Sequence, residues 1–240
     1  KISVAKQIME RFNLGRHQTE ICILPFSDTL QSSFIDTFNR TRAYIKIEDG
    51  CSSKCAYCII PKARGPVRSK PREDILREVS ALVSGGCKEI VLTGIEISSY
   101  QFDFIKLLED LDKIDRLERI RLGSLDPFFI SKNLVDSLVK IKKLCPHFHI
   151  SLQSGSSNTL AAMRRKYNAK IALERILYLK NSFRNCNLFA DVIVGFPGES
   201  DSDFAETVHF VECVRFLHLH IFPYSQGAGT EAAEMANQIS

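Results

Sequence analysis

Three cysteines lie close together on the chain, in the segment that begins at Gly50. Cys51, Cys55 and Cys58 form the pattern C-x3-C-x2-C on a predicted loop that follows the first predicted strand. Thiolates are soft ligands that bind zinc or iron–sulfur clusters. A structural zinc ion usually takes four protein ligands, commonly as two pairs of cysteines. No second pair follows in the sequence, and three thiolates suit a cubane cluster with one open iron, so we favour an iron–sulfur site.

The remaining cysteines stand alone, and each fits a small buried apolar side chain better than a ligand. They are Cys22, Cys87, Cys145, Cys186 and Cys213. The charged segment Lys1–Arg16 lacks the apolar stretch of a signal peptide. No apolar run reaches the roughly 18 residues that a transmembrane helix needs. We therefore expect a cytoplasmic protein whose thiols stay reduced.

The elements that must position the cysteines alternate between strands and helices. Apolar runs predict strands at Ala43–Glu48, Glu89–Thr93, Arg119–Leu122, His147–Leu152, Leu188–Val194 and Leu217–Phe222. Amphipathic patterns predict helices at Pro71–Ser84, Asp103–Lys113, Ser131–Lys143, Asn168–Phe183 and Asp201–Phe216. This alternation predicts an α/β fold with a parallel sheet and right-handed crossovers. Periodicity leaves an open doubly wound sheet and a partly closed barrel as alternatives, and both bind ligands at the carboxyl ends of the strands.

The ends of two helices carry local signals. Pro71 fits a first helical position, with acidic residues in the first turn, and Ser200 with Asp203 resembles a capping box. Before the first strand, Lys1–Phe12 fits a short helix and Thr19–Phe38 is polar and irregular. With 240 residues, 45% of them apolar and 25% charged, the chain has the composition of a globular protein and excludes wholesale disorder.

The charge is unevenly distributed along the chain. Lys plus Arg is 32 and Asp plus Glu is 28, which gives a net charge of +4. The segment from Cys51 to Arg72 holds six basic residues and no acid, and Ser151–Arg184 holds seven basic residues against Glu174 alone. Such stretches can attract a polyanion such as nucleic acid, or they can be solvated loops and helix faces.

The C-x3-C-x2-C loop, with Tyr57 before its last cysteine, resembles the radical S-adenosylmethionine (SAM) superfamily. In that family the three cysteines hold a [4Fe-4S] cluster, and the amino and carboxylate groups of SAM chelate the fourth iron. An electron from the cluster cleaves SAM to yield a 5′-deoxyadenosyl radical. The resemblance implies that Cys51, Cys55 and Cys58 are the cluster ligands and that Tyr57 lies near the SAM adenine.

Further motifs resemble the methylthiotransferases of this superfamily. They are Arg42–Cys51, Ile59–Ser69, Glu89–Glu96, His149–Gly155, Met163–Tyr167, Asp191–Glu199 and Phe222–Ser225. The motif ARGPVRS at Ala63–Ser69, together with Thr93-Gly94-Ile95, is most similar to the subgroup that acts on N6-threonylcarbamoyladenosine of tRNA. The resemblance implies a partial (β/α)6 barrel and a reaction at position 37 of the anticodon loop. Related subgroups act on isopentenyladenosine or on an aspartate of a ribosomal protein, and these stay as alternatives.

The site residues expected besides the cysteines fall into two sets. From strand ends and motif matches, we expect SAM to contact Tyr57, Thr93, Gly94, Ser124, Gln153 and Asp191. From the basic segments, we expect RNA to contact Lys62, Arg64, Arg68, Lys70, Arg72, Arg164 and Arg165. The triplet Arg164-Arg165-Lys166 could equally be a solvated helix end. For His147 and His149, which lie on a predicted strand, we expect packing in the core.

The family also implies segments that this sequence does not display. Its members resemble one another in an N-terminal domain with a second cluster and in a C-terminal RNA-binding domain. Only 50 residues precede Cys51, and they contain Cys22 alone. We therefore expect residues 1–41 to be a linker tail and residues 42–240 to be the radical SAM core. Expected partners are tRNA and a reducing electron donor of the flavodoxin or ferredoxin type. A zinc-stapled RNA-binding module without catalysis is the alternative from another class.

Overall fold

The computed structural model describes residues 41–239 of the chain. The predicted helix Lys1–Phe12, the segment Thr19–Phe38 and nearly all of the predicted linker 1–41 lie outside the described residues.

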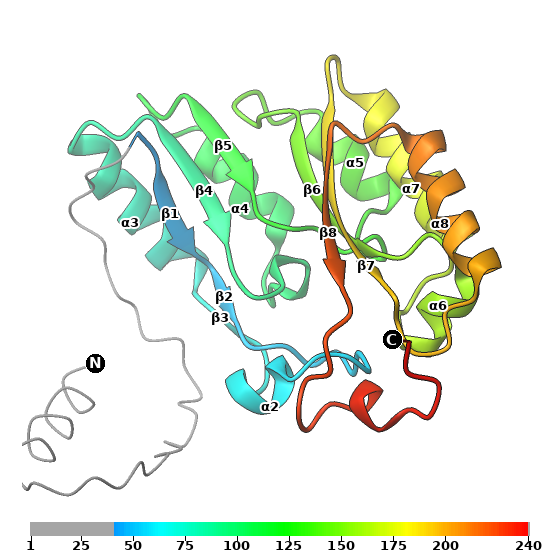
Figure 1. Ribbon diagram of the computed structural model, residues 1–240. Helices are drawn as coiled ribbons and strands as arrows, with labels where there is room; N and C mark the ends of the chain where they lie inside the picture. Colours follow the sequence, from blue (N-terminus) through cyan, green and yellow to red (C-terminus); the bar gives the residue numbers. More distant parts are fainter. Residues whose placement is uncertain (1–40, 240) are drawn as a thin grey trace, which may run out of the picture.

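Six parallel strands form two three-stranded sheets that lie side by side (Figure 1). The first sheet has the order β1-β4-β5, with β1 at Ala43–Lys46, β4 at Glu89–Thr93 and β5 at Arg119–Leu122. The second has the order β6-β7-β8, with β6 at His147–Gln153, β7 at Asn187–Val194 and β8 at His218–Pro223. Isolated parallel bridges, Ile120 to Leu144 and Leu125 to Ile150, connect the two sheets. The predicted α/β fold with a partial (β/α)6 barrel is confirmed.

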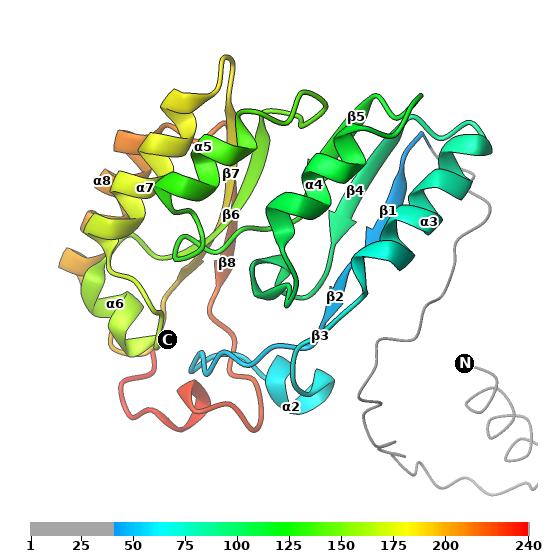
Figure 2. The same cartoon turned by 180° about the vertical axis from the view of Figure 1, so that it is seen from behind.

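Helices cover the outer face of both sheets (Figure 2). They are α3 at Arg72–Ser84, α4 at Phe104–Asp112, α5 at Lys132–Leu138, α7 at Ala169–Ser182 and α8 at Asp201–Val214. At the carboxyl ends of the strands lie the short α2 (Ile60–Arg64), α6 (Ser157–Ala162), two 3₁₀ turns, η1 (Ile97–Ser99) and η2 (Ala232–Glu234), and the antiparallel pair β2 (Glu48–Asp49) and β3 (Arg68–Ser69). No helix within residues 41–239 combines the length and apolar character required to cross a membrane.

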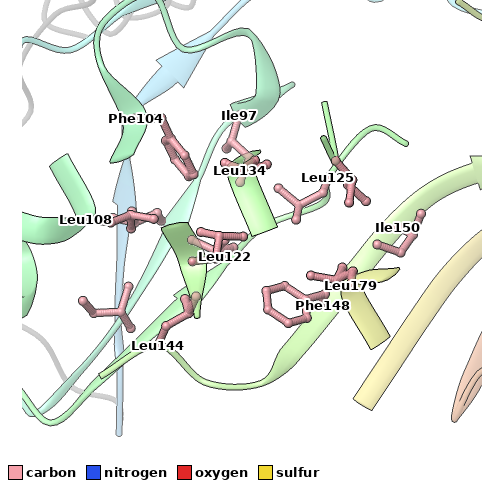
Figure 3. Close-up of a cluster of buried hydrophobic side chains, with 14 of the residues drawn as sticks. Ile97, Phe104, Leu108, Leu122, Leu125, Leu134, Leu144, Phe148, Ile150 and Leu179 are labelled. Carbon is pink, nitrogen blue, oxygen red and sulfur yellow. The ribbon is translucent and has the colours of Figure 1, made fainter. Parts of the chain in front are cut away.

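The core lies between the strands and these helices (Figure 3). In β6, Phe148, Ile150 and Leu152 are fully buried, and the residues between them are half-buried. Successive side chains of a strand point to opposite faces, so one face of β6 packs under the helices. The other face, with His147, His149, Ser151 and Gln153, therefore lines the concave side of the barrel.

Most element bounds agree with the sequence prediction, and two local predictions need correction. The capping box of Ser200 and Asp203 is present at the start of α8. Helix α5 ends at Leu138, before the predicted Lys143, because the chain enters turns there while Ile141 and Leu144 still bury apolar side chains. Pro71 is the residue before the first helical position of α3, with an extended ψ of 143°.

Candidate functional site

The segment Gly50–Ile59, called here the cysteine loop, lies at the carboxyl ends of the strands. It starts at Gly50, which has a φ of +86° and lies so close to Pro66 that a Cβ atom would stand 2.1 Å from the Pro66 carbonyl oxygen. Only glycine fits both conditions. The backbone N–H of Cys51 donates to Gly65 O at 3.1 Å, and that of Ala56 donates to Met163 O at 3.1 Å. The loop is therefore held by α2 on one side and by the end of α6 on the other.

Cys51, Cys55 and Cys58 are free thiols and are partly exposed. Burial raises the pKa of the Cys58 thiol above its usual value, and negative charge on Cys55 and Cys51 raises it further. A cation bound to the sulfurs would reverse this effect. Tetrahedral ligands of one zinc ion would bring sulfurs to about 3.8 Å from one another. Among the described residues, the group with three candidate ligand atoms within 4.8 Å does not include these cysteines, so their sulfurs are spread more widely than the ligands of one zinc ion.

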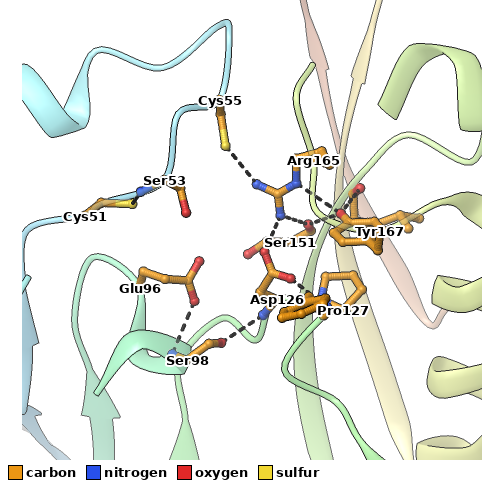
Figure 4. Close-up of polar contacts among 12 residues, drawn as sticks. Cys51, Ser53, Cys55, Glu96, Ser98, Asp126, Pro127, Ser151, Arg165 and Tyr167 are labelled. Carbon is orange, nitrogen blue, oxygen red and sulfur yellow. Dashed lines mark hydrogen bonds and ion pairs between the residues drawn. The ribbon is translucent and has the colours of Figure 1, made fainter. Parts of the chain in front are cut away.

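A buried guanidinium faces the cysteine loop (Figure 4). Arg165 Nη1 donates to Cys55 Sγ at 3.3 Å and to the Tyr57 hydroxyl at 3.4 Å. Its Nη2 donates to Asp126 Oδ2 at 2.7 Å and to the Ser151 carbonyl at 3.1 Å. Tyr167 also contacts this group, and only 7% of the Arg165 side chain is exposed. Arg165 is thus fixed by three elements and places a positive charge beside a cysteine sulfur.

Two glutamates support the same region from the β4 side. Glu48 is fully buried, and its Oε2 accepts the backbone N–H of Glu96 at 2.8 Å. A Cβ atom on Gly94 would stand 2.6 Å from this oxygen, so the predicted cofactor residue Gly94 owes its type to the close approach of Glu48. Burial raises the pKa of Glu48 to about 7. Burial also raises the pKa of Glu96, which extends toward the cysteine loop (Figure 4).

The residues predicted to contact SAM lie at one end of the barrel but not in one pocket. Tyr57, Gln153 and Asp191 line a cavity of about 200 Å³ with Ile193 and the segment Phe222–Ser225. Thr93 and Gly94 end β4 beside Glu48, and Ser124 bonds His149. The SAM contacts of these six residues stay predictions.

At the wall of this cavity, two histidines contact the carboxylate of Asp191. His149 Nε2 lies 2.9 Å from Asp191 Oδ1, and His220 Nδ1 lies 3.2 Å from the same oxygen. Burial alone would raise the pKa of Asp191, but the hydrogen bonds and charges of His149 and His220 lower it below its usual value. The prediction that His149 packs in the core is wrong, because its side chain is on the concave face of β6. His147 is half-buried on the same concave face, with its ring centroid 4.5 Å from that of Phe189, so it too lies outside the helix-covered core.

Sequence reasoning did not select His220, Glu96, Asp126 or Tyr167. A signal for His220 exists in the alternation His218-x-His220 on a strand, which places both imidazoles on one face. Glu96 and Tyr167 are the last residues of two quoted motifs, Glu89–Glu96 and Met163–Tyr167, which could have drawn attention to them, whereas Asp126 lies outside every quoted motif.

The residues predicted to contact RNA divide by exposure. Lys62, Arg64 and Arg164 are exposed, Arg68 and Arg72 are half-buried, and Arg72 pairs with Asp110 at 2.7 Å. The prediction is wrong for Lys70, which is buried and ion-paired with Glu78 at 2.7 Å. It does not fit Arg165 either, because that guanidinium is enclosed against Cys55 and Asp126.

Sequence comparison identifies relatives of this chain. Residues 45–211 match the profile of the radical SAM superfamily. The threonylcarbamoyladenosine tRNA methylthiotransferase MtaB of Bacillus subtilis is 42% identical over 207 residues, which are 84% of this chain and 46% of that protein. A tRNA-2-methylthio-N(6)-dimethylallyladenosine synthase of Desulfitobacterium hafniense is 39% identical over 218 residues, which are 88% of this chain and 49% of that protein. The chain thus spans about half the length of these curated relatives.

Solved structures share the fold at low sequence identity. The radical S-adenosylmethionine methyltransferase TsrM of Kitasatospora setae, with cobalamin and a [4Fe-4S] cluster bound, matches with a TM-score of 0.68 at 15% identity over 80% of this chain and 36% of that one. Coproporphyrinogen III oxidase HemN of Escherichia coli, a radical SAM enzyme, matches with a TM-score of 0.60 at 15% identity over 83% of this chain and 48% of that one.

The chain belongs to the radical SAM superfamily, and within it the chain is similar to methylthiotransferases. The cofactors of the superfamily are a [4Fe-4S] cluster and SAM, and the free, spaced thiols of the cysteine loop fit such a cluster.

Proposed function

We propose that this chain is the radical-generating core of an enzyme that attaches a methylthio group to N6-threonylcarbamoyladenosine at position 37 of tRNA. The observation that carries the proposal is the cysteine loop, held from both sides at the carboxyl ends of the strands and faced by Arg165. The name of the Bacillus subtilis relative supports the choice of nucleoside.

In this proposal Cys51, Cys55 and Cys58 hold the cluster. When bound, the cluster and SAM would supply the radical chemistry needed to remove hydrogen from C2 of the adenine. The protein contributes position and the exclusion of water. Arg165 holds Cys55 and Tyr57 in place through hydrogen bonds. Tyr57, Gln153 and Asp191 line one cavity, and we propose that SAM binds there.

We propose that the RNA approaches over α2. Lys62 and Arg64 are exposed there, and both follow the cysteine loop directly in the chain. A target base must leave its stack to reach the radical, so phosphate contacts beside the site would hold an unstacked anticodon loop. We further propose that residues 42–240 form one core domain, that 1–41 link it to a preceding domain, and that the enzyme works in the cytoplasm with a flavodoxin-type or ferredoxin-type donor.

A second candidate keeps the reaction and changes the nucleoside. The observation that favours it is that a tRNA-2-methylthio-N(6)-dimethylallyladenosine synthase is 39% identical to this chain.

Two measurements test the proposal. Anaerobic reconstitution of the chain should yield about four iron atoms per chain and, with SAM and dithionite, 5′-deoxyadenosine. Colourless protein with one zinc ion would contradict it and favour the zinc-stapled module. The nucleoside is tested by mass spectrometry of tRNA from a strain that lacks the gene. Threonylcarbamoyladenosine should lose its methylthio group, whereas loss from isopentenyladenosine alone would favour the second candidate.

A further inference from the structure

His149, Asp191 and His220, called here the histidine group, converge from three neighbouring strands. They lie on β6, β7 and β8, and register pairs Asp191 with His220 directly. One ligand atom from each lies within 4.8 Å of the others. The three residues are far apart in sequence, so their convergence is a property of the folded barrel.

The spacing of these atoms fits a shared divalent ion. Two ligands that each lie about 2.05 Å from a metal are about 2.9 Å apart at a right angle and about 3.3 Å apart at the tetrahedral angle. Asp191 Oδ1 lies 2.9 Å from His149 Nε2 and 3.2 Å from His220 Nδ1. Both separations fall in this interval. Only the distance between the two imidazole nitrogens, which is within 4.8 Å, would have to shorten for all three atoms to bind one ion.

The surroundings of His149 resemble those of a metal ligand. Its second ring nitrogen, Nδ1, lies 2.8 Å from Ser124 Oγ, which fixes the ring so that Nε2 faces Asp191. Metal-binding histidines commonly hold their second nitrogen in this way. On the other side, Asp191 lines the cavity that Tyr57 and Gln153 share, so an ion here would keep open positions toward that cavity.

We propose that the histidine group is a binding site for one divalent transition-metal ion, zinc or ferrous iron, with two imidazoles and one carboxylate as ligands. In the bound state each imidazole is neutral and turns an unprotonated nitrogen to the ion, with its single proton on the other ring nitrogen, His149 Nδ1 beside Ser124 Oγ and His220 Nε2. Its three ligands lie outside the cysteine loop, although Asp191 lines a cavity with Tyr57 of that loop, and the site does not depend on the identity of the RNA substrate.

The test uses Co²⁺ as a coloured probe in a chain with Cys51→Ala, Cys55→Ala and Cys58→Ala, which removes the thiols of the cysteine loop as competing ligands. We expect one Co²⁺ per chain, with ligand-field bands and no sulfur-to-metal charge transfer. His149→Ala and His220→Ala should each weaken binding by at least 100-fold, and Ser124→Ala by about tenfold. His209→Ala is the matched control, because this histidine is exposed on α8 and lies away from the group.

A second measurement covers the case in which the cysteine variant does not fold. Elemental analysis of the cluster-loaded chain, supplied with Zn²⁺, should give one zinc ion in addition to about four iron atoms. The zinc should be absent from the His220→Ala protein, whose iron content should not change. If neither probe binds, or if binding survives in both histidine variants, the three residues form a hydrogen-bonded network only and the proposal is overturned.

Discussion

The two halves of the barrel hold their polar groups in different ways. In the first half, β1-β4-β5, the chemistry lies beyond the strands, on the cysteine loop and the turn that carries Glu96. In the second half, β6-β7-β8, it lies on the strands themselves, where the histidine group faces the interior. Loops adapt to ligands more readily than strands, so the first half suits the cluster, and the second half offers a rigid small site beside the cavity proposed for SAM.

Arg165 connects the two halves. It follows α6 in the second half, yet it donates to Cys55 and Asp126 in the first. If the halves work as separate sites, changes at the cysteines must leave the histidine group intact. Changes at Arg165 should affect the cysteine side alone.

The largest expected effect is that of Cys55→Ala. Loss of one of three thiolate ligands should abolish stable cluster assembly, with iron falling from about four atoms per chain to near zero. The measurement is iron content together with 5′-deoxyadenosine formation. The control is Cys213→Ala, because Cys213 is an exposed cysteine on α8. Equal iron content in the Cys55→Ala and Cys213→Ala proteins would contradict the assignment of Cys55 as a cluster ligand.

Arg165→Met should change the properties of the cluster without removing it. The guanidinium and its N–H···S hydrogen bond stabilise negative charge, so their loss should lower the midpoint potential by about 60 mV, a tenfold change for a one-electron couple. An EPR-monitored redox titration measures this. Arg164→Met is the matched control, since Arg164 is adjacent and its side chain is 53% exposed. Arg165→Lys keeps the positive charge and should recover part of the lost potential. Equal midpoint potentials in Arg165→Met and Arg164→Met would show that Arg165 serves packing only.

A buried carboxyl group in each half gives opposite pH dependence. In the first half, burial raises the pKa of Glu48 to about 7, so ionisation becomes costly as the pH rises from the unfolded value of about 4.3 through 7. Glu48→Gln should therefore stabilise the fold by about 1–3 kcal/mol at pH 8 and leave it unchanged at pH 4. Urea unfolding at the two pH values measures the difference, with the exposed Glu206→Gln as control. A gain of equal size at both pH values would contradict the assignment.

In the second half, hydrogen bonds from Ser156 and Ser200 lower the pKa of Asp203 to about 2. This stabilisation is present above the unfolded value of about 3.9 and is lost as the pH falls through 2. Asp203→Asn should cost about 1–2 kcal/mol at pH 6, as loss of a helix cap does, and less at pH 3. Urea unfolding at both pH values tests this, with exposed Asp201→Asn as control. A cost that grows toward pH 3 would contradict it.

Sequence separation decides how much of each half could be predicted. The three cysteines lie within one short loop, and apolar alternation predicts the strands that carry it, so the first half could be read from the sequence. The histidine group could not, because Asp191 is 42 residues from His149 and 29 from His220, and only the parallel register brings them together. The short α2 and α6 were missed for a similar reason, since one or two turns carry little periodicity.

The basic residues illustrate the same limit at single positions. Arg164 has a positive φ of 59°, and this turn directs Arg164 to solvent and Arg165 to the interior. Lys70, which precedes α3, can be buried because its ammonium group pairs with Glu78 on that helix, eight residues later. Neither outcome follows from counting basic residues along the sequence, because the count does not distinguish Arg164 from Arg165 or Lys70 from the other basic residues of its segment.

The smallest expected effect is on RNA affinity, and it sharpens which end of the barrel meets the substrate. Arg64 is 53% exposed beside the cysteine loop, and Asp49 lies 3.9 Å away, so a phosphate would compete with a weak ion pair. Arg64→Ala should weaken tRNA binding by about fivefold and reduce the salt dependence by about one phosphate contact, with iron content unchanged. Anisotropy titrations at several salt concentrations measure both quantities.

Arg184→Ala provides the control for that experiment. Arg184 is exposed in the loop before β7, at the amino ends of the strands and therefore opposite the cysteine loop. If tRNA binds over α2, loss of Arg184 should leave the affinity within about twofold, because screening over one Debye length removes the influence of a distant charge. If both variants weaken binding equally, the attraction comes from the net charge of +4 and not from the face beside the cysteines. The first half would then hold the cofactor without presenting the RNA surface.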